Sequence, residues 1–287
     1  MRKAFLILLL SLTAGFSGFA QELIAYQDSV KGAYPFLLYV PGDYCDTAAV
    51  KKPLIVFLHG KSRSGRDLSM VTKYGPVDAL RRGLDIDALI ISPQTAIEGW
   101  NPDKVMAIVD WVGARYAYDP DRLYVIGMSM GGWGTFKVAA AYPERFAAAI
   151  AECGGYNGPL DPLKKLPLWV LHGTADNITP LHCSTRVVNQ MIETGGADRL
   201  RFSWLIGCDH SILARSFLLK DMYEWLFSHT LSDPDRPVCR EYDMTPKDLN
   251  GAYMYLDPTQ RKALPIVGAC LGKHGRQRAI GDRKSVV

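Results

Sequence analysis

One serine stands in the setting that nucleophilic catalysis needs. Ser129 is the centre of Gly127-Met128-Ser129-Met130-Gly131, a G-x-S-x-G pattern with an apolar run before it and a helix-like run after it. In a sharp strand-to-helix turn of this kind the glycines allow close backbone contact, and the serine hydroxyl is presented at the amino end of the helix. A serine that only caps a helix is the alternative interpretation. The strand–turn–helix context favours the nucleophile.

A serine needs a general base, and the base needs an acid to orient it. Asp176 follows the apolar run 168–171, and His210 follows the run 201–206, so both come directly after predicted strands. Catalytic groups gather at the carboxyl ends of parallel strands, and the chain order Ser, Asp, His suits such a sheet. Asp209 adjoins His210 and is poorly placed to orient it. Asp176 as a turn or capping residue is the alternative. His59 and His172, each before a glycine at a strand end, are expected to have packing roles.

Two backbone N–H groups must stabilise the oxyanion of an acyl-transfer reaction. We expect one from Met130, the residue after the nucleophile, and the other from Lys61, in the loop after His59-Gly60. Trp100, Trp133 and Tyr156 are expected near the rim of the site, where aromatic rings could stack on sugars or aryl acids, although each could equally be core packing. No cofactor and no metal are expected, because the cysteines and histidines lack zinc-site spacing.

Strands and helices alternate between these residues. Apolar runs predict strands at 53–58, 88–92, 122–127, 146–151, 168–171 and 201–206, and helices are expected at about 101–116, 133–142, 179–194 and 216–228. This βαβα order predicts an α/β fold of three layers, with a mostly parallel central sheet. Only about a dozen residues separate the strands ending near Ala151 and starting at Leu168, so we expect no large cap domain over the site.

The chain divides into four predicted parts. Residues 1–20 resemble a signal peptide, with Arg2-Lys3, an apolar run and small residues before a cleavage site after Ala20, so a secreted or periplasmic protein is expected. Residues 21–235 are the predicted catalytic domain, 236–271 an appendage packing on it, and 272–287 a solvated basic tail. Five basic residues and one acidic residue of that tail account for the net charge of +4. Residues 1–271 therefore have no net charge, which argues against nucleic-acid binding. No membrane association is expected after cleavage.

All six cysteines follow the predicted cleavage site. An oxidising compartment permits disulfides, although sequence does not give the pairing. If Asp176 and His210 meet, Cys183 and Cys208 are expected to be close enough to bond.

The segment 122–155 resembles the α/β-hydrolase superfamily. It carries Arg122-Leu123-Tyr124-Val125-Ile126 before the G-x-S-x-G pattern and Cys153-Gly154-Gly155 at its end. The resemblance extends over about 53–229 through Leu58-His59-Gly60, the 172–176 run and the 207–210 run. It is closest to the secreted esterases related to phospholipase/carboxylesterases, dienelactone hydrolases and prolyl-oligopeptidase-type peptidases. The resemblance implies a core of the eight-stranded type with Ser129, Asp176 and His210 as the triad.

Two departures from the resemblance are visible. Lys61 stands where many relatives carry a small or aliphatic residue, and the segment after Thr230 does not map onto the family pattern. The expected activity is carboxylic ester hydrolysis on a small-molecule or polysaccharide-linked ester, with feruloyl or acetyl esters of plant polysaccharide preferred. A serine peptidase of the prolyl-oligopeptidase type and a non-catalytic carbohydrate-binding module are the alternatives.

Overall fold

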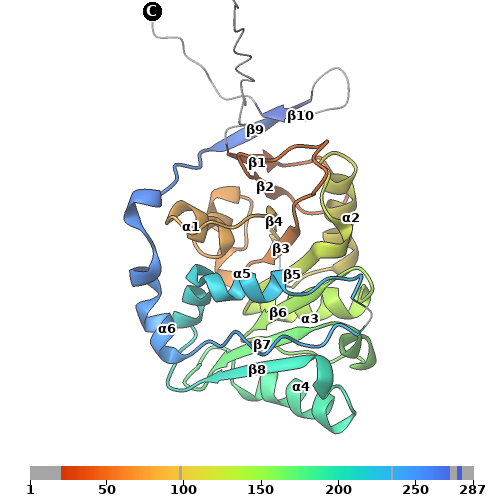
Figure 1. The fold of residues 1–287 in the computed structure, drawn as a ribbon, viewed down its shortest axis with the longest axis vertical. Helices are drawn as coiled ribbons and strands as arrows, with labels where there is room; N and C mark the ends of the chain where they lie inside the picture. The colour runs from red at the N-terminus through yellow and green to blue at the C-terminus, as the bar shows by residue number, and fades with distance from the viewer. Residues whose placement is uncertain (1–20, 97–98, 234, 272–276, 280–287) are drawn as a thin grey trace, which may run out of the picture.

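The computed structural model describes residues 21–96, 99–233, 235–271 and 277–279, so the predicted signal peptide lies outside the described residues. Their strands form one sheet of ten, in the order β10-β9-β1-β2-β4-β3-β5-β6-β7-β8 (Figure 1). The strands are β1 (Glu22–Tyr26), β2 (Phe36–Val40), β3 (Leu54–Leu58), β4 (Leu89–Pro93), β5 (Leu123–Met128), β6 (Ala148–Glu152), β7 (Leu168–Gly173), β8 (Leu200–Leu205), β9 (Ile266–Leu271) and β10 (Gln277–Ala279).

The sheet is mostly parallel, as predicted. Strands β3 to β8 pair in parallel, and β1 pairs in parallel with β9. Only β2 with its neighbours β1 and β4, and β10 with β9, are antiparallel. Strands β3 and β5 are buried at every position, which is why they are continuous apolar runs in the sequence.

Helices cover both faces of the sheet. The helices are α1 (Pro76–Arg81), α2 (Pro102–Gly113), α3 (Met130–Ala141), α4 (His182–Glu193), α5 (Lys220–Phe227) and α6 (Pro246–Gly251). Alternate residues of β3 enter two separate cores: Ile55 and Phe57 pack with α1, α5 and α6, whereas Val56 and Leu58 pack with α2, α3 and α4. The predicted three-layer α/β architecture is therefore confirmed (Figure 1).

Local signals explain where the helices begin. The Asn101 side chain accepts a hydrogen bond from the Lys104 N–H at 3.0 Å, and Pro102 occupies the first turn of α2. Thr245 and Asp248 form a reciprocal capping box at α6. The helix expected over 216–228 is instead a 3-10 helix, η6 (Ile212–Leu218), followed by α5, and α4 starts three residues after Thr179.

The connection between β6 and β7 contains only the short 3-10 helix η4 (Asp161–Lys165). The expectation of no large cap at this point is confirmed.

The segment after α5 runs along one side of the molecule and rejoins the sheet (Figure 1). Helix α6 packs against η6, and β9 pairs with β1 through Leu23 and Ile266. Within the segment expected to be a solvated tail, Gln277–Ala279 forms β10 against β9. In the described part of the chain, no helix has the length and apolar character required to cross a membrane.

Candidate active site

Ser129 occupies a strained turn between β5 and α3. Its φ of 61° lies in the left-handed region, which is unfavourable for a residue with a side chain. The Ser129 N–H donates to the Glu152 carbonyl at 2.9 Å, which ties the turn to the end of β6. The side chain is half-buried at the start of α3. The turn therefore holds the hydroxyl at the amino end of a helix.

Glycine is required on both sides of this turn. A Cβ at Gly131 would lie 1.8 Å from the Leu58 carbonyl oxygen, and a Cβ at Gly127 would lie 2.5 Å from the Gly131 carbonyl oxygen. Both contacts involve backbone, which cannot rotate away. The G-x-S-x-G pattern is thus a packing requirement of the turn as well as a sequence signature.

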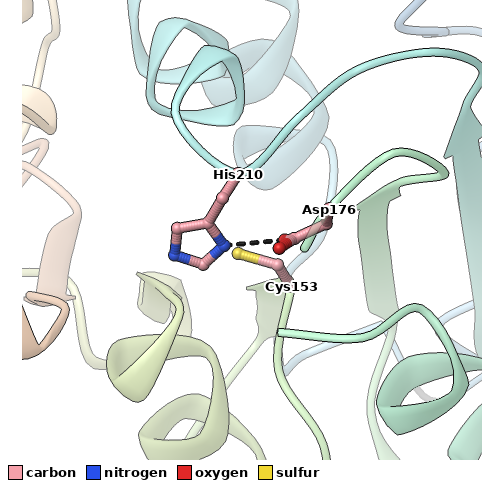
Figure 2. A group of neighbouring side chains, drawn as sticks. All are labelled: Cys153, Asp176 and His210. Carbon is pink, nitrogen blue, oxygen red and sulfur yellow. Dashed lines mark hydrogen bonds and ion pairs between the residues drawn. The ribbon is translucent and has the colours of Figure 1, made fainter. Parts of the chain in front are cut away.

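Asp176 and His210 meet where β7 and β8 end. His210 Nδ1 lies 2.7 Å from Asp176 Oδ2, and the aspartate side chain is fully buried (Figure 2). The other carboxylate oxygen accepts from the N–H groups of Ile178 and Thr179 at 2.9 and 2.8 Å. These two bonds fix the carboxylate so that Oδ2 faces the imidazole. Because an ionised carboxylate only accepts, the bond assigns the hydrogen to Nδ1 and makes Nε2 the ring nitrogen that can accept a proton.

Ser129 and His210 line one pocket of about 520 Å³, together with Gly60 and Lys61. The structure thus brings all three predicted triad residues to the carboxyl-terminal edge of the sheet, from the ends of β5, β7 and β8. This is the edge at which catalytic groups of such sheets collect.

The two expected oxyanion donors flank Ser129. Met130 is the first residue of α3. Backbone N–H groups in the first turn of a helix have no acceptor within the helix. Lys61 is the first residue of the 3-10 helix η1 (Lys61–Arg63). The residue before it, Gly60, lies so close to Ser129 that a Cβ added to Gly60 would be 3.3 Å from Ser129 Cβ. The Gly60 N–H donates to the Tyr74 hydroxyl, which holds this loop against the turn.

The expectation that Trp100 lies at the rim is wrong. Trp100 is 4% exposed, packs edge-on against His59 and Tyr34, and donates its indole N–H to the His59 carbonyl at 3.3 Å. Its ring lies against Gly134 of α3, so it cannot meet a substrate. Asn101 predicted that a helix begins directly after Trp100. A capping residue does not indicate whether the residue before it faces solvent.

Trp133 and Tyr156 are half-buried, and neither belongs to the residues lining the pocket of Ser129 and His210. The Trp133 ring lies against Gly155, and Tyr156 stacks on Phe136 with ring centres 6.3 Å apart. The aromatic residues that line the pocket are instead Tyr74 and Tyr253. Tyr253 belongs to the appendage, which the sequence did not connect with the site.

The expected disulfide between Cys183 and Cys208 is absent, since both are free thiols in the structure. Cys208 is buried, with its backbone against Gly173, whereas Cys183 lies in the first turn of α4 with its carbonyl near Gly155. The contact of Asp176 with His210 brings the two loops together without bringing these two sulfurs into bonding position.

The other two histidines near strand ends are packed in the core. His59 is fully buried, and burial lowers its pKa to about 4. His172 is also fully buried, with its ring nitrogens 2.7 Å from Ser184 Oγ and 2.8 Å from the Thr179 carbonyl oxygen, and burial lowers its pKa too. Both observations agree with the packing roles expected for these residues.

The sequence did not indicate two buried residues that lie next to the predicted triad residues. Cys153 has φ 37° and lies beside the Asp176–His210 pair (Figure 2). One donor atom each from Cys153, Asp176 and His210 lies within 4.8 Å of the others, a spacing that a metal ion could use. However, burial raises the pKa of the thiol well above its usual value, which disfavours the thiolate that metals bind.

Glu152, the second of these residues, is the last residue of β6 and is fully buried. It accepts a hydrogen bond from the Ser216 hydroxyl, while its Oε2 has no partner among the described residues. Burial raises its pKa from 4.5 to about 8. The sequence signal for Glu152 was a carboxyl group in an otherwise apolar strand. A buried carboxyl group must be neutral or paired.

Comparison with solved structures decides the fold family. A thermostable esterase superposes with a TM-score of 0.58 and 27% identity, covering 73% of this chain and 63% of its own. The chain has the α/β-hydrolase fold. The model of the prolyl oligopeptidase family matches residues 95–164 of the chain, which include the Ser129 turn.

Several curated relatives of the chain are named as esterases. A probable feruloyl esterase C of Aspergillus terreus is 25% identical over 171 residues, which cover 56% of this chain and 62% of the relative. Acetylxylan esterase A of Emericella nidulans is 43% identical over 56 residues, 20% of this chain and 18% of the relative. The chain thus spans less than two thirds of the length of each of these proteins.

Proposed function

We propose that this α/β-hydrolase cleaves carboxylic esters through a serine acyl-enzyme mechanism, with Ser129 as nucleophile, His210 as general base and Asp176 as the orienting acid. The observation that carries the proposal is the 2.7 Å bond between Asp176 and His210 Nδ1, in a pocket that the Ser129 turn also lines. A strained serine, an oriented imidazole and a buried carboxylate together make the constellation that acyl transfer needs.

Each residue has a defined part in the proposed reaction. Ser129 Oγ attacks the ester carbonyl as His210 Nε2 takes its proton, and the Met130 and Lys61 N–H groups stabilise the oxyanion. Collapse of this intermediate expels the alcohol, which receives the proton from His210. Water, activated by the same imidazole, then attacks the acyl-enzyme and releases the acid. Asp176 holds the imidazole and stabilises its positive charge in both steps.

The preferred substrates are feruloyl or acetyl esters on plant polysaccharide. Relatives named feruloyl esterase and acetylxylan esterase support this class. The short β6–β7 connection supports it as well, because no inserted cap at that point limits access by a polymer. We further propose that the protein is exported with its signal peptide removed after Ala20, which would place it where such polymers occur.

A serine peptidase is the second candidate, because the matching family model is that of the prolyl oligopeptidase family. The same three residues could cleave amides. Matched ester and amide substrates with one acyl group distinguish the candidates: higher kcat/KM on the amide than on its ester would favour the peptidase.

The test compares wild type with Ser129→Ala. Both proteins are incubated with feruloylated arabinoxylan, acetylated xylan and p-nitrophenyl acetate, and release of ferulate, acetate and p-nitrophenol is measured. We expect acid release from a polysaccharide ester by wild type alone. Cleavage of p-nitrophenyl acetate without acid release from either polymer would reject the polysaccharide class. Equal activity of the two proteins, or no activity of either, would reject the ester-hydrolase proposal and revive a binding role.

A further inference from the structure

The wall of the Ser129–His210 pocket carries a strong excess of positive charge. Five basic residues line it, and among the described lining residues Asp78 is the only acidic one. The basic residues are Lys61, Arg63, Lys73, Arg82 and Arg215. They come from the loop after β3, the segment leading into α1, the residue directly after α1, and η6, so the charge surrounds the site from several elements.

Asp78 neutralises one of these charges. Its carboxylate lies 2.7 Å from Nε of Arg82, which is four residues later and directly follows α1. Arg63 and Arg215, in contrast, have no carboxylate partner among the described residues. No side-chain nitrogen of Arg63 has a hydrogen-bond acceptor within the described part of the chain, and the Arg215 guanidinium reaches only the Leu249 carbonyl, at 3.5 Å. Two half-buried guanidinium groups beside the catalytic candidates thus retain donors for an anion.

Aromatic rings hold these guanidinium groups in place. Arg63 lies over the Tyr74 ring at 5.5 Å, and the Tyr74 hydroxyl also accepts from Gly60 beside Ser129. Arg82 and Arg215 lie 5.1 and 5.2 Å from the centre of the Tyr253 ring. Cation–π contacts orient a guanidinium without neutralising its charge. Both unpaired groups therefore have an aromatic partner and keep their charge.

We infer that the pocket selects esters that carry a carboxylate near the scissile bond, with Arg63 and Arg215 as the residues that recognise it. This inference rests on the proposed ester hydrolysis and names its substrate class. A planar guanidinium matches a carboxylate with two parallel hydrogen bonds, and the positive pocket attracts the anion before contact. A uronic acid ester fits this chemistry when the carboxylate is on the alcohol, and a dicarboxylic monoester fits it when the carboxylate is on the acyl group.

Two matched substrate pairs test the inference in the wild-type protein. O-acetyl galacturonate and O-acetyl galactose differ only in having a carboxylate or a hydroxymethyl group on the alcohol. Methyl hydrogen succinate and methyl pentanoate place a carboxylate or an ethyl group on the acyl side. In at least one pair we expect kcat/KM of the anionic ester to exceed that of its neutral partner by about tenfold at low salt. This preference should shrink as ionic strength rises, and the pair that shows it identifies the side of the bond.

Variants assign the preference to residues. Arg63→Gln and Arg215→Gln should each reduce the anionic-to-neutral ratio of kcat/KM by about tenfold, mainly through a higher KM for the anion. Arg199→Gln removes an equal charge next to the start of β8, at the opposite end of the strands, and should leave the ratio unchanged.

The outcomes distinguish a failure of the inference from a failure of the proposed ester hydrolysis. Hydrolysis of neutral esters with a ratio of one or less in both pairs would overturn the inference and leave ester hydrolysis standing. An anionic preference that both arginine variants retain would also overturn it. Absence of hydrolysis of all four esters, together with no cleavage of p-nitrophenyl acetate, would overturn the proposed function and the inference with it.

Discussion

Replacing Glu152 by glutamine should change how stability depends on pH. Glu152 is fully buried, and burial raises its pKa from 4.5 to about 8. Between these two values the unfolded chain releases the proton while the folded protein keeps it. The unfolded state therefore binds fewer protons, and the free energy of unfolding contributed by this group falls as pH rises from 4.5 to about 8. Above that interval the group is ionised in both states, and the loss is complete.

The size of the effect follows from the width of the interval. About 3.5 pH units at about 1.4 kcal/mol each give a loss on the order of 5 kcal/mol by pH 8. Glutamine does not ionise, so Glu152→Gln should remove this loss. Its side-chain oxygen can still accept from Ser216, whereas its amide donors replace the unpartnered Oε2. The unpaired amide carries a constant cost of about 1–3 kcal/mol, so the readout is the pH slope and not the stability at one pH.

Three groups whose charges couple to Glu152 do not titrate in the same interval. Cys153, Tyr74 and Tyr223 are the residues whose charges couple to Glu152, and burial raises the pKa of each above its ordinary value. All three stay neutral between pH 4.5 and 8. The slope difference between the two proteins therefore reports Glu152 alone.

Urea unfolding followed by tryptophan fluorescence measures the effect at pH 4.5, 6, 7 and 8. The stability of Glu152→Gln relative to wild type should increase by about 3–5 kcal/mol across this range. Glu144→Gln is the matched control, because Glu144 is exposed, and its curve should stay parallel to that of wild type. Parallel curves for Glu152→Gln and wild type would refute the reasoning that Glu152 is buried as a neutral acid.

Three further variants test other parts of the structure. Asp176→Asn should lower kcat for ester hydrolysis by at least about 10²-fold with folding intact by circular dichroism, because the imidazole loses its orienting charge; retention of activity would reject the role. Gly131→Ala should prevent soluble expression or lower Tm by more than about 10 °C, since its Cβ would overlap the Leu58 carbonyl, whereas Gly268→Ala, with open space at the site, should fold normally. Trp100→Ala should destabilise the protein by about 3–5 kcal/mol in urea unfolding, as a buried core residue does; a loss below 1 kcal/mol would restore the rim interpretation.

The positions of the candidate catalytic residues were predictable because residues that follow successive parallel strands lie at the same edge of the sheet. Ser129, Asp176 and His210 each follow an apolar run, and the carboxyl ends of β5, β7 and β8 lie at one edge of the sheet. Strands β1 and β2 were not predicted; β2 is a short, fully buried run that no turn motif or helix pattern marks.

Features that depend on side-chain direction were not predictable. Trp100 faces the core although it lies in the predicted loop before a helix, and Cys183, in the first turn of α4, is not bonded to Cys208. The position of Cys153 beside the acid–base pair depends on its φ of 37°, which the sequence does not show. Tyr253 reaches the pocket only because the appendage returns along the side of the domain, and that path is set by packing of α6 on η6.

Covalent labelling tests the central claim most directly. Wild type, Ser129→Ala and His210→Ala are treated with a fluorophosphonate, and the adduct is located by peptide mass spectrometry. We predict one adduct on wild type, at Ser129, none on Ser129→Ala, and labelling of His210→Ala slowed by at least about 10²-fold. An adduct on another residue, or equal labelling of all three proteins, would contradict the assignment of Ser129 as a nucleophile activated by His210.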